Sequence, residues 1–527
     1  MTVILHHLRF AGSTILHHLW GLLAIPVILI ATPLLAEEPS PNVVVFMVDD
    51  LGWQDVSHPF GPEITPLNRR YHTPNLERLA LRGTTFTDAY AASPVCTPTR
   101  TAFLTGRHPA RTGITYWTLH ADRDTSAAHP RLRNPPWRLQ GLAEGDVTLP
   151  SIFERAGYRT VHLGKAHFGA IGTSGADPTR LGFETNIAGH GPGGPGSFYG
   201  IHDFGARKRQ GKTGPSVWDV PGLDRYHGRD VHLTEVLAEE AVAEIRRSED
   251  DPRPFLIHFA PYAVHAPIMA NHRHLHRYAE LHPREAAYAT MIETTDAALG
   301  RILDTLDDLG LEDDTIVVFT SDNGGLSAHA RGGPAHRHNA PLRSGKGSAY
   351  EGGVRVPLVI AGPSRLRMIG EGRRVSIPVS VIDLFPTLLE LAGIEMPIEH
   401  APTVDGHALT KVLRTEGETD GLQDRGLAWH MPHQWGASGP GIEPFTSYRR
   451  GIWKILYFHD GPRVELYDLQ TDLGEARDLA AERPEVTRRL LRELDGWIDR
   501  IGADLSIDIE SERPIPRPAE FASDRVK

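Results

Sequence analysis

The chain has 527 residues, enough for a large core and for two domains rather than one. Hydrophobic residues make up 40% and charged residues 23% of the sequence, which is ordinary for a soluble globular protein. The formal net charge of −11 argues against a nucleic-acid or anionic-membrane surface, and a polyanionic substrate would need a local basic pocket.

The first 36 residues have the pattern of a secretory signal. An apolar stretch from Leu19 to Ala36 gives way at once to acidic and proline-rich sequence, so we expect a signal peptide over 1–36. A stretch of roughly 18 residues is also at the lower limit for a membrane span, so an uncleaved anchor is the alternative. The sequence therefore predicts export, periplasmic or secreted, with membrane contact only if this segment is retained.

Short apolar strands and amphipathic helices alternate along the next part of the chain. The run "NVVVFMVDD" is apolar throughout before its two carboxylates, as expected for a strand buried on both faces. This alternation predicts an α/β fold with a large, mostly parallel sheet flanked by helices. The expected strands lie near 42–50, 158–165, 253–260, 315–323 and 356–363, and the expected helices near 73–83, 148–156, 232–247, 285–309 and 379–393.

The pattern changes after a polar stretch near residues 415–424. "YRRGIWKILYF" and "RVELYDL" predict antiparallel strands, and residues 484–501 predict a final helix. We therefore expect a catalytic domain over 40–420 and a smaller C-terminal α+β subdomain with an antiparallel sheet over 421–510. The Gly/Pro-rich segment from Gly189 to Val220 is predicted to be a long surface excursion.

Polar side chains follow two of the predicted strands. Asp49 and Asp50 end the first, and Asp322 and Asn323 end a second one far away in the sequence. Ligands bind beyond the carboxyl ends of strands in open parallel sheets. Three carboxylates and one amide offer only oxygen, which suits calcium or magnesium. If the two strands are neighbours, these residues form a metal site.

The only cysteine, Cys96, lies in "SPVCTPTRTAFLTGR". Exported proteins usually pair their cysteines, and this one has no partner within the chain. Pro98 and the apolar run after it predict a helix that starts at Cys96, with Arg100 one turn further on the same face. A cysteine there is either a thiolate of lowered pKa or the substrate of a modification.

Several blocks together resemble one family. "CTPTRTAFLTGR" resembles the signature of the type I sulfatases, in which the cysteine of C-x-P-x-R is oxidised to formylglycine. "GKAHFG", "PYAVHAP", "TSDNGG" and "LRSGKGSAYEGGVRVP" are similar to other blocks of the family, in the same order. The resemblance covers roughly residues 41 to 480 and implies an alkaline-phosphatase-like fold.

The resemblance also implies a role for each matching residue. One calcium ion would be held by Asp49, Asp50, Asp322 and Asn323, and touched by the formylglycine that replaces Cys96 (3-oxoalanine). Arg100 would steady that group, whose hydrate attacks the sulfate sulfur. The sulfate would be flanked by Lys165 and His167, which are expected to face the same way on a strand. His265 would donate a proton to the leaving alcohol, and Lys346 would be a second cation that binds the sulfate.

The substrate is the least determined part of this prediction. "GLAWHMPHQWG" resembles a loop of carbohydrate-directed members, so His433 and Trp435 are expected in the leaving-group pocket, with a packed domain interface as the alternative. The overall prediction is an exported, exo-acting sulfatase for sulfated saccharides that needs a formylglycine-generating maturation enzyme. The rivals are a phosphonate monoester or phosphodiester hydrolase of the same superfamily and a catalytically silent binder of sulfated glycans.

Overall fold

The computed structural model describes residues 40–520, apart from 328–330, 332–333, 367, 369, 371, 416, 418, 420 and 437–438. The predicted signal segment, residues 1–36, lies outside the described residues. In the described part of the chain, no helix has both the length and the apolar character needed to cross a membrane.

Strand β1 (Asn42–Val48) lies inside the main sheet and is buried along its whole length. Val44, Phe46 and Val48 belong to one hydrophobic cluster, whereas Val43, Val45 and Met47 belong to a second. Successive side chains of a strand point to opposite faces, so both faces of β1 are covered. This confirms the prediction from its continuous apolar run.

The main sheet has eight strands in the order β10-β2-β9-β8-β1-β7-β5-β6. All neighbours in it pair in parallel except β9, which pairs antiparallel with both β8 and β2. The expected large, mostly parallel sheet is therefore confirmed. Besides β1, its strands are β2 (Thr84–Phe86), β5 (Arg159–Gly164), β6 (Thr185–Ile187), β7 (Phe255–Ala260), β8 (Thr315–Ser321), β9 (Leu358–Ala361) and β10 (Arg373–Val375).

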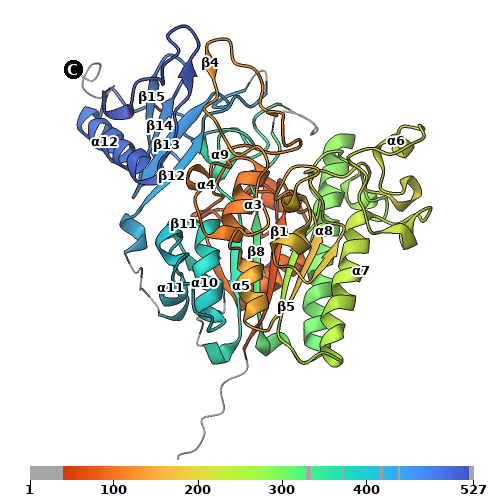
Figure 1. Ribbon diagram of the computed structural model, residues 1–527. Helices are drawn as coiled ribbons and strands as arrows, with labels where there is room; N and C mark the ends of the chain where they lie inside the picture. Colours follow the sequence, from red (N-terminus) through yellow and green to blue (C-terminus); the bar gives the residue numbers. More distant parts are fainter. Residues whose placement is uncertain are drawn as a thin grey trace, which may run out of the picture. The chain divides into compact units, whose positions relative to one another are not determined.

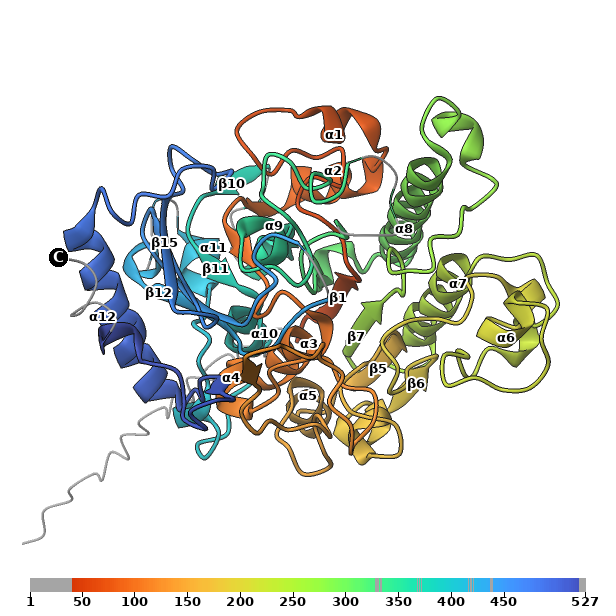
Figure 2. The same ribbon diagram turned by 90° about the horizontal axis from the view of Figure 1, so that it is seen from above.

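Two layers of helices enclose this sheet (Figure 1 and Figure 2). One hydrophobic cluster joins it to α2 (Pro74–Arg82), α7 (Leu233–Arg246) and α8 (Pro283–Asp308). The other cluster joins the opposite face to α3 (Cys96–Thr105), α5 (Leu149–Arg155), α10 (Leu384–Leu391) and α11 (Thr410–Arg414). Shorter elements are α1 (Pro66–Arg70), α4 (Pro109–Thr112), α6 (Ala206–Arg209), α9 (Glu351–Val354), β3 (Ala89–Tyr90), β4 (Leu132–Arg133), β11 (Val379–Ser380) and β16 (Ile507–Asp508).

A second, antiparallel sheet follows in the C-terminal part, as predicted. Its strands are β12 (Gly426–Met431), β13 (Phe445–Arg450), β14 (Trp453–Phe458) and β15 (Arg463–Asp468). Helix α12 (Pro484–Ile501) packs on one face, and the other face packs on residues of the large domain such as Tyr90 and Tyr116. The chain from Ser40 onward forms one compact unit, so the division at residue 420 stays a prediction.

The prediction that the segment from Gly189 to Val220 is a surface excursion is wrong for the first part of this segment. Residues 191–200 are buried, whereas Ile201 and residues 207–215 are exposed. The glycines explain the difference, because they let the backbone approach other groups more closely than a Cβ atom would allow. Gly193 and Gly194 lie against the rings of His167 and His265.

Candidate active site

The two pairs of polar residues meet at one edge of the main sheet. Strands β1 and β8 are parallel neighbours with Val48 opposite Ser321, so the residues that follow them lie side by side. The Asp50 amide donates to Asp322 Oδ1 at 3.1 Å, and Asn323 Nδ2 donates to Asp50 Oδ1 at 2.8 Å. Asp49, Asp50, Asp322 and Asn323 are all fully buried.

Cys96 is the first residue of α3 and lies above this cluster. Its Sγ is 3.8 Å from Asp49 Oδ1 and 4.0 Å from Asp50 Oδ1. Burial raises the pKa of the Cys96 thiol to about 12, against the opposing effect of two nearby lysines. Burial therefore favours the protonated thiol over the thiolate in this arrangement.

Three cations surround the carboxylates. Lys165 Nζ donates to Asp49 Oδ1 at 2.7 Å, and Lys346 Nζ donates to Asp50 Oδ2 at 2.9 Å. Arg100 donates from Nε to Asp322 Oδ2 at 2.7 Å and from Nη1 to the Lys165 carbonyl oxygen at 2.9 Å. Arg100 thus ties the cysteine helix both to the carboxylate cluster and to the segment after β5.

The carboxylates in this cluster have shifted pKa values. Burial raises the pKa of Asp49 to about 8, although Lys165 acts against it. Burial acts on Asp50 as well, but Lys346, His265 and Lys165 outweigh it and hold the pKa of Asp50 below its ordinary value. Asp49 therefore has too little positive charge around it in this arrangement, and a further cation would stabilise its ionised form.

The residues fit a hard divalent cation. Donor atoms of Asp49, Asp50, Cys96 and Asp322 all lie within 4.8 Å of one another. Asp49 Oδ2 and Asn323 Oδ1 are buried and have no hydrogen-bond partner among the described residues. Buried oxygens without donors are costly unless something else satisfies them, and a metal ion would do so.

Lys165 and His167 do not lie on a strand, contrary to the expectation. Strand β5 ends at Gly164, which has a φ of +93°, and a Cβ atom there would lie 2.1 Å from the Ala260 carbonyl oxygen. The chain turns after this residue, and His167 itself has a φ of +56°. Lys165 therefore points to the carboxylates, whereas His167 lines the cavity beside Cys96.

Hydrogen bonds to carbonyl oxygens set the tautomers of the two histidines. His265 Nδ1 donates to the Ala266 oxygen at 2.7 Å, so its Nε2 is left as an acceptor, 3.8 Å from Asp50 Oδ2. His167 Nε2 donates to the Thr118 oxygen at 2.9 Å, which leaves Nδ1 without a proton. Burial and then Lys346 lower the pKa of His265 to about 3, and burial lowers that of His167.

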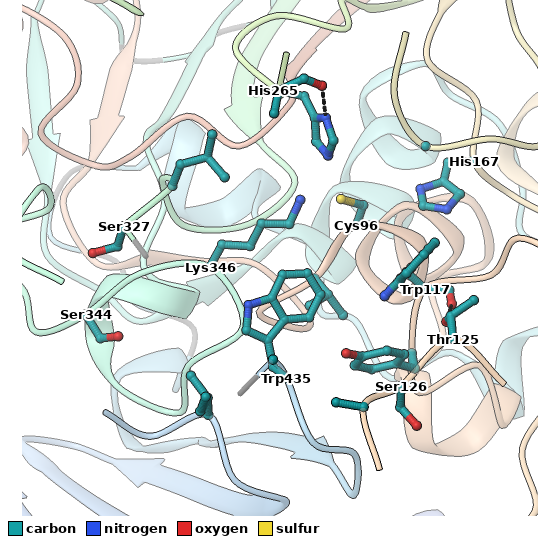
Figure 3. Close-up of a pocket in the computed structure, with 18 of the residues that line it drawn as sticks. Cys96, Trp117, Thr125, Ser126, His167, His265, Ser327, Ser344, Lys346 and Trp435 are labelled. Carbon is teal, nitrogen blue, oxygen red and sulfur yellow. Dashed lines mark hydrogen bonds between the residues drawn. The ribbon is translucent and has the colours of Figure 1, made fainter. Parts of the chain in front are cut away.

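A cavity of about 560 Å³ opens above Cys96 (Figure 3). His167, His265 and Lys346 lie around the cysteine, and Trp117 and Trp435 lie on the other side of the space. Hydroxyl groups on the wall come from Thr125, Ser126, Ser327 and Ser344. The volume is in the range of small-ligand sites, roughly 300–1,000 Å³.

The structure separates the two residues predicted for the leaving-group pocket. Trp435 lines the cavity, and its indole lies 5.7 Å from Lys346 Nζ. His433 is fully buried, outside the set of lining residues, with its Nε2 2.8 Å from Thr115 Oγ1 and its ring stacked on Tyr116 at 4.8 Å. We therefore place His433 behind the wall, where it supports Tyr116.

Several lining residues were absent from the predicted site. Tyr116 and Trp117 follow the cysteine helix, and Trp218 comes from the excursion that was expected on the surface. Tyr116 Oη donates to the Gln434 oxygen at 3.1 Å, which places it beside Trp435. The signal that would have found them is aromatic residues in loops near a matched block, because aromatic side chains in loops commonly serve binding.

Fold and site together define a class of enzyme. A mostly parallel sheet with buried aspartates, lysines and a cysteine at its carboxyl edge is the arrangement of a hydrolase with an alkaline-phosphatase-like fold. Comparison with known families is more specific. The Sulfatase family model matches residues 41–394, and the N-sulphoglucosamine sulphohydrolase, C-terminal model matches residues 345–499.

Individual proteins agree with the family models. The human N-acetylgalactosamine-6-sulfatase is 31% identical over 78% of this chain and 74% of its own length. The steryl-sulfatase of Rattus norvegicus is 33% identical over 80% of this chain and 77% of its own length. A sulfatase of Formosa agariphila is 28% identical over 96% of this chain and 97% of its own length.

A solved structure is similar as well. The crystal structure of Ps i-CgsB in complex with k-i-k-neocarrahexaose superimposes with a TM-score of 0.70 at 25% identity, covering 87% of this chain and 92% of that one. The chain belongs to the sulfatase family and is a sulfuric ester hydrolase.

Proposed function

We propose that this protein is an exported, exo-acting sulfatase that hydrolyses a sulfate monoester of a saccharide, using a formylglycine made from Cys96 and one calcium ion. The observation that carries the proposal is the position of Cys96, on the floor of the cavity and within 4.0 Å of two buried aspartates. The formylglycine hydrate would supply an oxygen nucleophile for sulfur and a second hydroxyl through which sulfate can later be expelled.

Asp49, Asp50, Asp322 and Asn323 would hold the calcium ion, which supplies positive charge beside the reacting sulfate. Three carboxylates face three cations in the cluster, so their formal charges cancel. A bound divalent cation makes the cluster positive and favourable for a sulfate ester, which is an anion. This supports a local basic pocket in a chain whose net charge is −11.

The remaining residues act on the ester and its leaving alcohol. Lys165 and Lys346 neutralise sulfate oxygens, and Arg100 holds residue 96 in place through the N-terminal turn of α3. Once protonated, His265 Nε2 can deliver a proton to the leaving oxygen, because its Nδ1 proton is committed to the Ala266 oxygen. His167 lies across the cavity from Lys346 and completes the surroundings of the sulfate.

Two of the relatives support a saccharide substrate, whereas the steryl-sulfatase is named for a sterol. One is named for N-acetylgalactosamine, and the solved structure of Ps i-CgsB contains a neocarrahexaose. The volume of the cavity, about 560 Å³, is in the range of small-ligand sites and supports action on a short part of a chain, as at its end. We also propose that residues 40–420 form the catalytic domain and 421–510 a subdomain that contributes Trp435, Gly436 and Ile442 to the cavity.

Peptide mass spectrometry across Cys96, in protein from its own host, tests the mechanism. We expect formylglycine at position 96 and inorganic sulfate release that is absent in Cys96→Ala, whose side chain no maturation enzyme can convert. An intact thiol in active protein would refute the proposal. A matched aryl phosphodiester should be turned over more slowly than the aryl sulfate, and the reverse result would favour the phosphodiesterase alternative.

A further inference from the structure

The wall of the cavity holds very little charge. Among the described residues that line it, Lys346 is the only Lys, Arg, Asp or Glu. Lys346 is already committed, since its Nζ lies 2.6 Å from Asp50 Oδ1 at the reacting end. A second anionic group on a bound substrate would therefore meet no further lysine or arginine among the described lining residues, where His167, His265 and His336 are the other basic side chains.

Aromatic rings form much of the remaining wall. Trp435 packs against Gly347, where a Cβ atom would lie 2.1 Å from the indole, so its position depends on a glycine beside the sulfate-binding lysine. Its ring also meets Tyr116 edge-on, with centroids 6.0 Å apart. Below Cys96 in Figure 3, Trp435 lies next to Lys346 and Trp117 next to His167, so both tryptophans flank the space for a leaving group.

Hydroxyl groups complete the wall, and Asp124 directly precedes two of the residues that carry them, Thr125 and Ser126. Ser327 also lines the cavity, and its Oγ is buried and has no hydrogen-bond partner in the described part of the chain. The carboxylate of Asp124 accepts hydrogen bonds from the Ser126 amide at 2.8 Å and from Trp137 Nε1 at 3.0 Å. These hydrogen bonds lower the pKa of Asp124 against the effect of burial.

We propose that the leaving group in this cavity is an uncharged sugar residue, with no sulfate or carboxylate other than the sulfate being cleaved. The inference rests on the proposed sulfatase function and narrows its substrate class. The apolar faces of a sugar ring pack on aromatic rings, and its hydroxyls pair with Ser and Thr hydroxyls. An additional sulfate would lose its hydration without gaining a partner, which is a strong source of discrimination.

Sulfate release from matched substrates tests this inference. The panel contains galactose and N-acetylglucosamine monosulfated at each ring position, the disulfated sugars with one further sulfate, and 4-nitrophenyl sulfate. We expect kcat/KM for the best monosulfated sugar to exceed that of each disulfated counterpart by at least about tenfold. An equal or faster disulfated sugar would overturn the inference, as would turnover of the aryl sulfate with no turnover of any monosulfated sugar. Failure on the whole panel by protein with converted Cys96 would overturn the proposed function as well.

A matched pair of variants tests the cause. Ser126→Lys and Ser126→Gln both lengthen a wall side chain next to Asp124, but only the lysine adds a charge. We expect the ratio of disulfated to monosulfated turnover to be at least about threefold higher in Ser126→Lys than in Ser126→Gln. An equal ratio in the two variants would show that wall charge does not set the preference.

Discussion

A methyl group added at Gly193 should reduce activity far more than one added at Gly194. A Cβ atom at Gly193 would lie 2.3 Å from His167 Cε1 and Nδ1, whereas one at Gly194 would lie 3.0 Å from His265 Nδ1. Ordinary contacts begin at 3.4 Å, so the His167 ring must move by about 1 Å and the His265 ring by a few tenths. A hydrogen bond of 2.9 Å to the Thr118 oxygen fixes His167, so the ring cannot move without losing it.

A displacement of about 1 Å at a catalytic group can reduce the rate about 100-fold. We therefore expect kcat/KM for an aryl sulfate to fall about 100-fold in Gly193→Ala and less than about threefold in Gly194→Ala. Neither glycine has a left-handed φ, so alanine brings no backbone strain and both variants should keep a Tm close to that of the parent. Activity of Gly193→Ala within threefold of the parent, or a greater loss in Gly194→Ala, would refute this reasoning.

Three further predictions concern the metal ion and a buried ion pair network. A chelator should abolish sulfate release, and Ca²⁺ at about 100 times its Kd should restore release and raise the Tm by about 2–3 °C. A Tm that does not change when Ca²⁺ is added would contradict the metal site. Lys454 is fully buried between Glu351 and Glu475, with its Nζ 2.9 Å from a carboxylate oxygen of each. Removing one partner of a buried ion pair costs roughly 3–5 kcal/mol of the free energy of unfolding, which for a folded part of about 480 residues corresponds to a Tm lowered by about 3–5 °C in Lys454→Met. As a control, Lys208→Met removes a partner of an exposed ion pair and should change the Tm by less than about 1 °C. Equal Tm shifts in Lys454→Met and Lys208→Met would show that burial of Lys454 does not strengthen its contribution. Burial raises the pKa of Glu475 to about 7, so the contribution of this carboxyl to stability is complete below pH 4.5 and is lost as the pH rises through 7. The Tm of Glu475→Gln minus the Tm of the parent should therefore increase between pH 5 and pH 8. A difference that stays constant over this range would refute the prediction.

The strand ends could be predicted because local patterns determine them. The apolar run before Asp49 indicates a strand buried on both faces, and the same holds for the run before Asp322. A parallel sheet places the carboxyl ends of such strands at one edge, so only their adjacency had to be assumed, and the pairing of β1 with β8 supplies it. The start of the helix at Cys96 could also be predicted from the local sequence, because Pro98 lies in its first turn, where proline is tolerated.

Other parts of the site depend on contacts between distant segments. The side chains of Lys165 and His167 diverge because Gly164 must pass close to Ala260, which no alternation pattern in the sequence reveals. Tyr116 reaches the wall through a hydrogen bond to Gln434, more than 300 residues away. The Gly/Pro-rich segment was misjudged because composition alone does not distinguish an exposed loop from one that packs against histidine rings.

In the proposed function, catalysis and specificity depend on different parts of the chain. The buried aspartates, Lys165 and Arg100 hold one another at the edge of the main sheet, so a change to any of them alters the whole charge balance. The wall around the leaving group is built from loops, and the Ala127 amide joins two of them by donating to the Gln434 oxygen at 3.2 Å. Loops tolerate substitution better than buried ion pairs do. If the proposed function holds, substitutions in the wall near Ser126 or Trp435 should change which saccharide is cleaved while the charged cluster stays as it is.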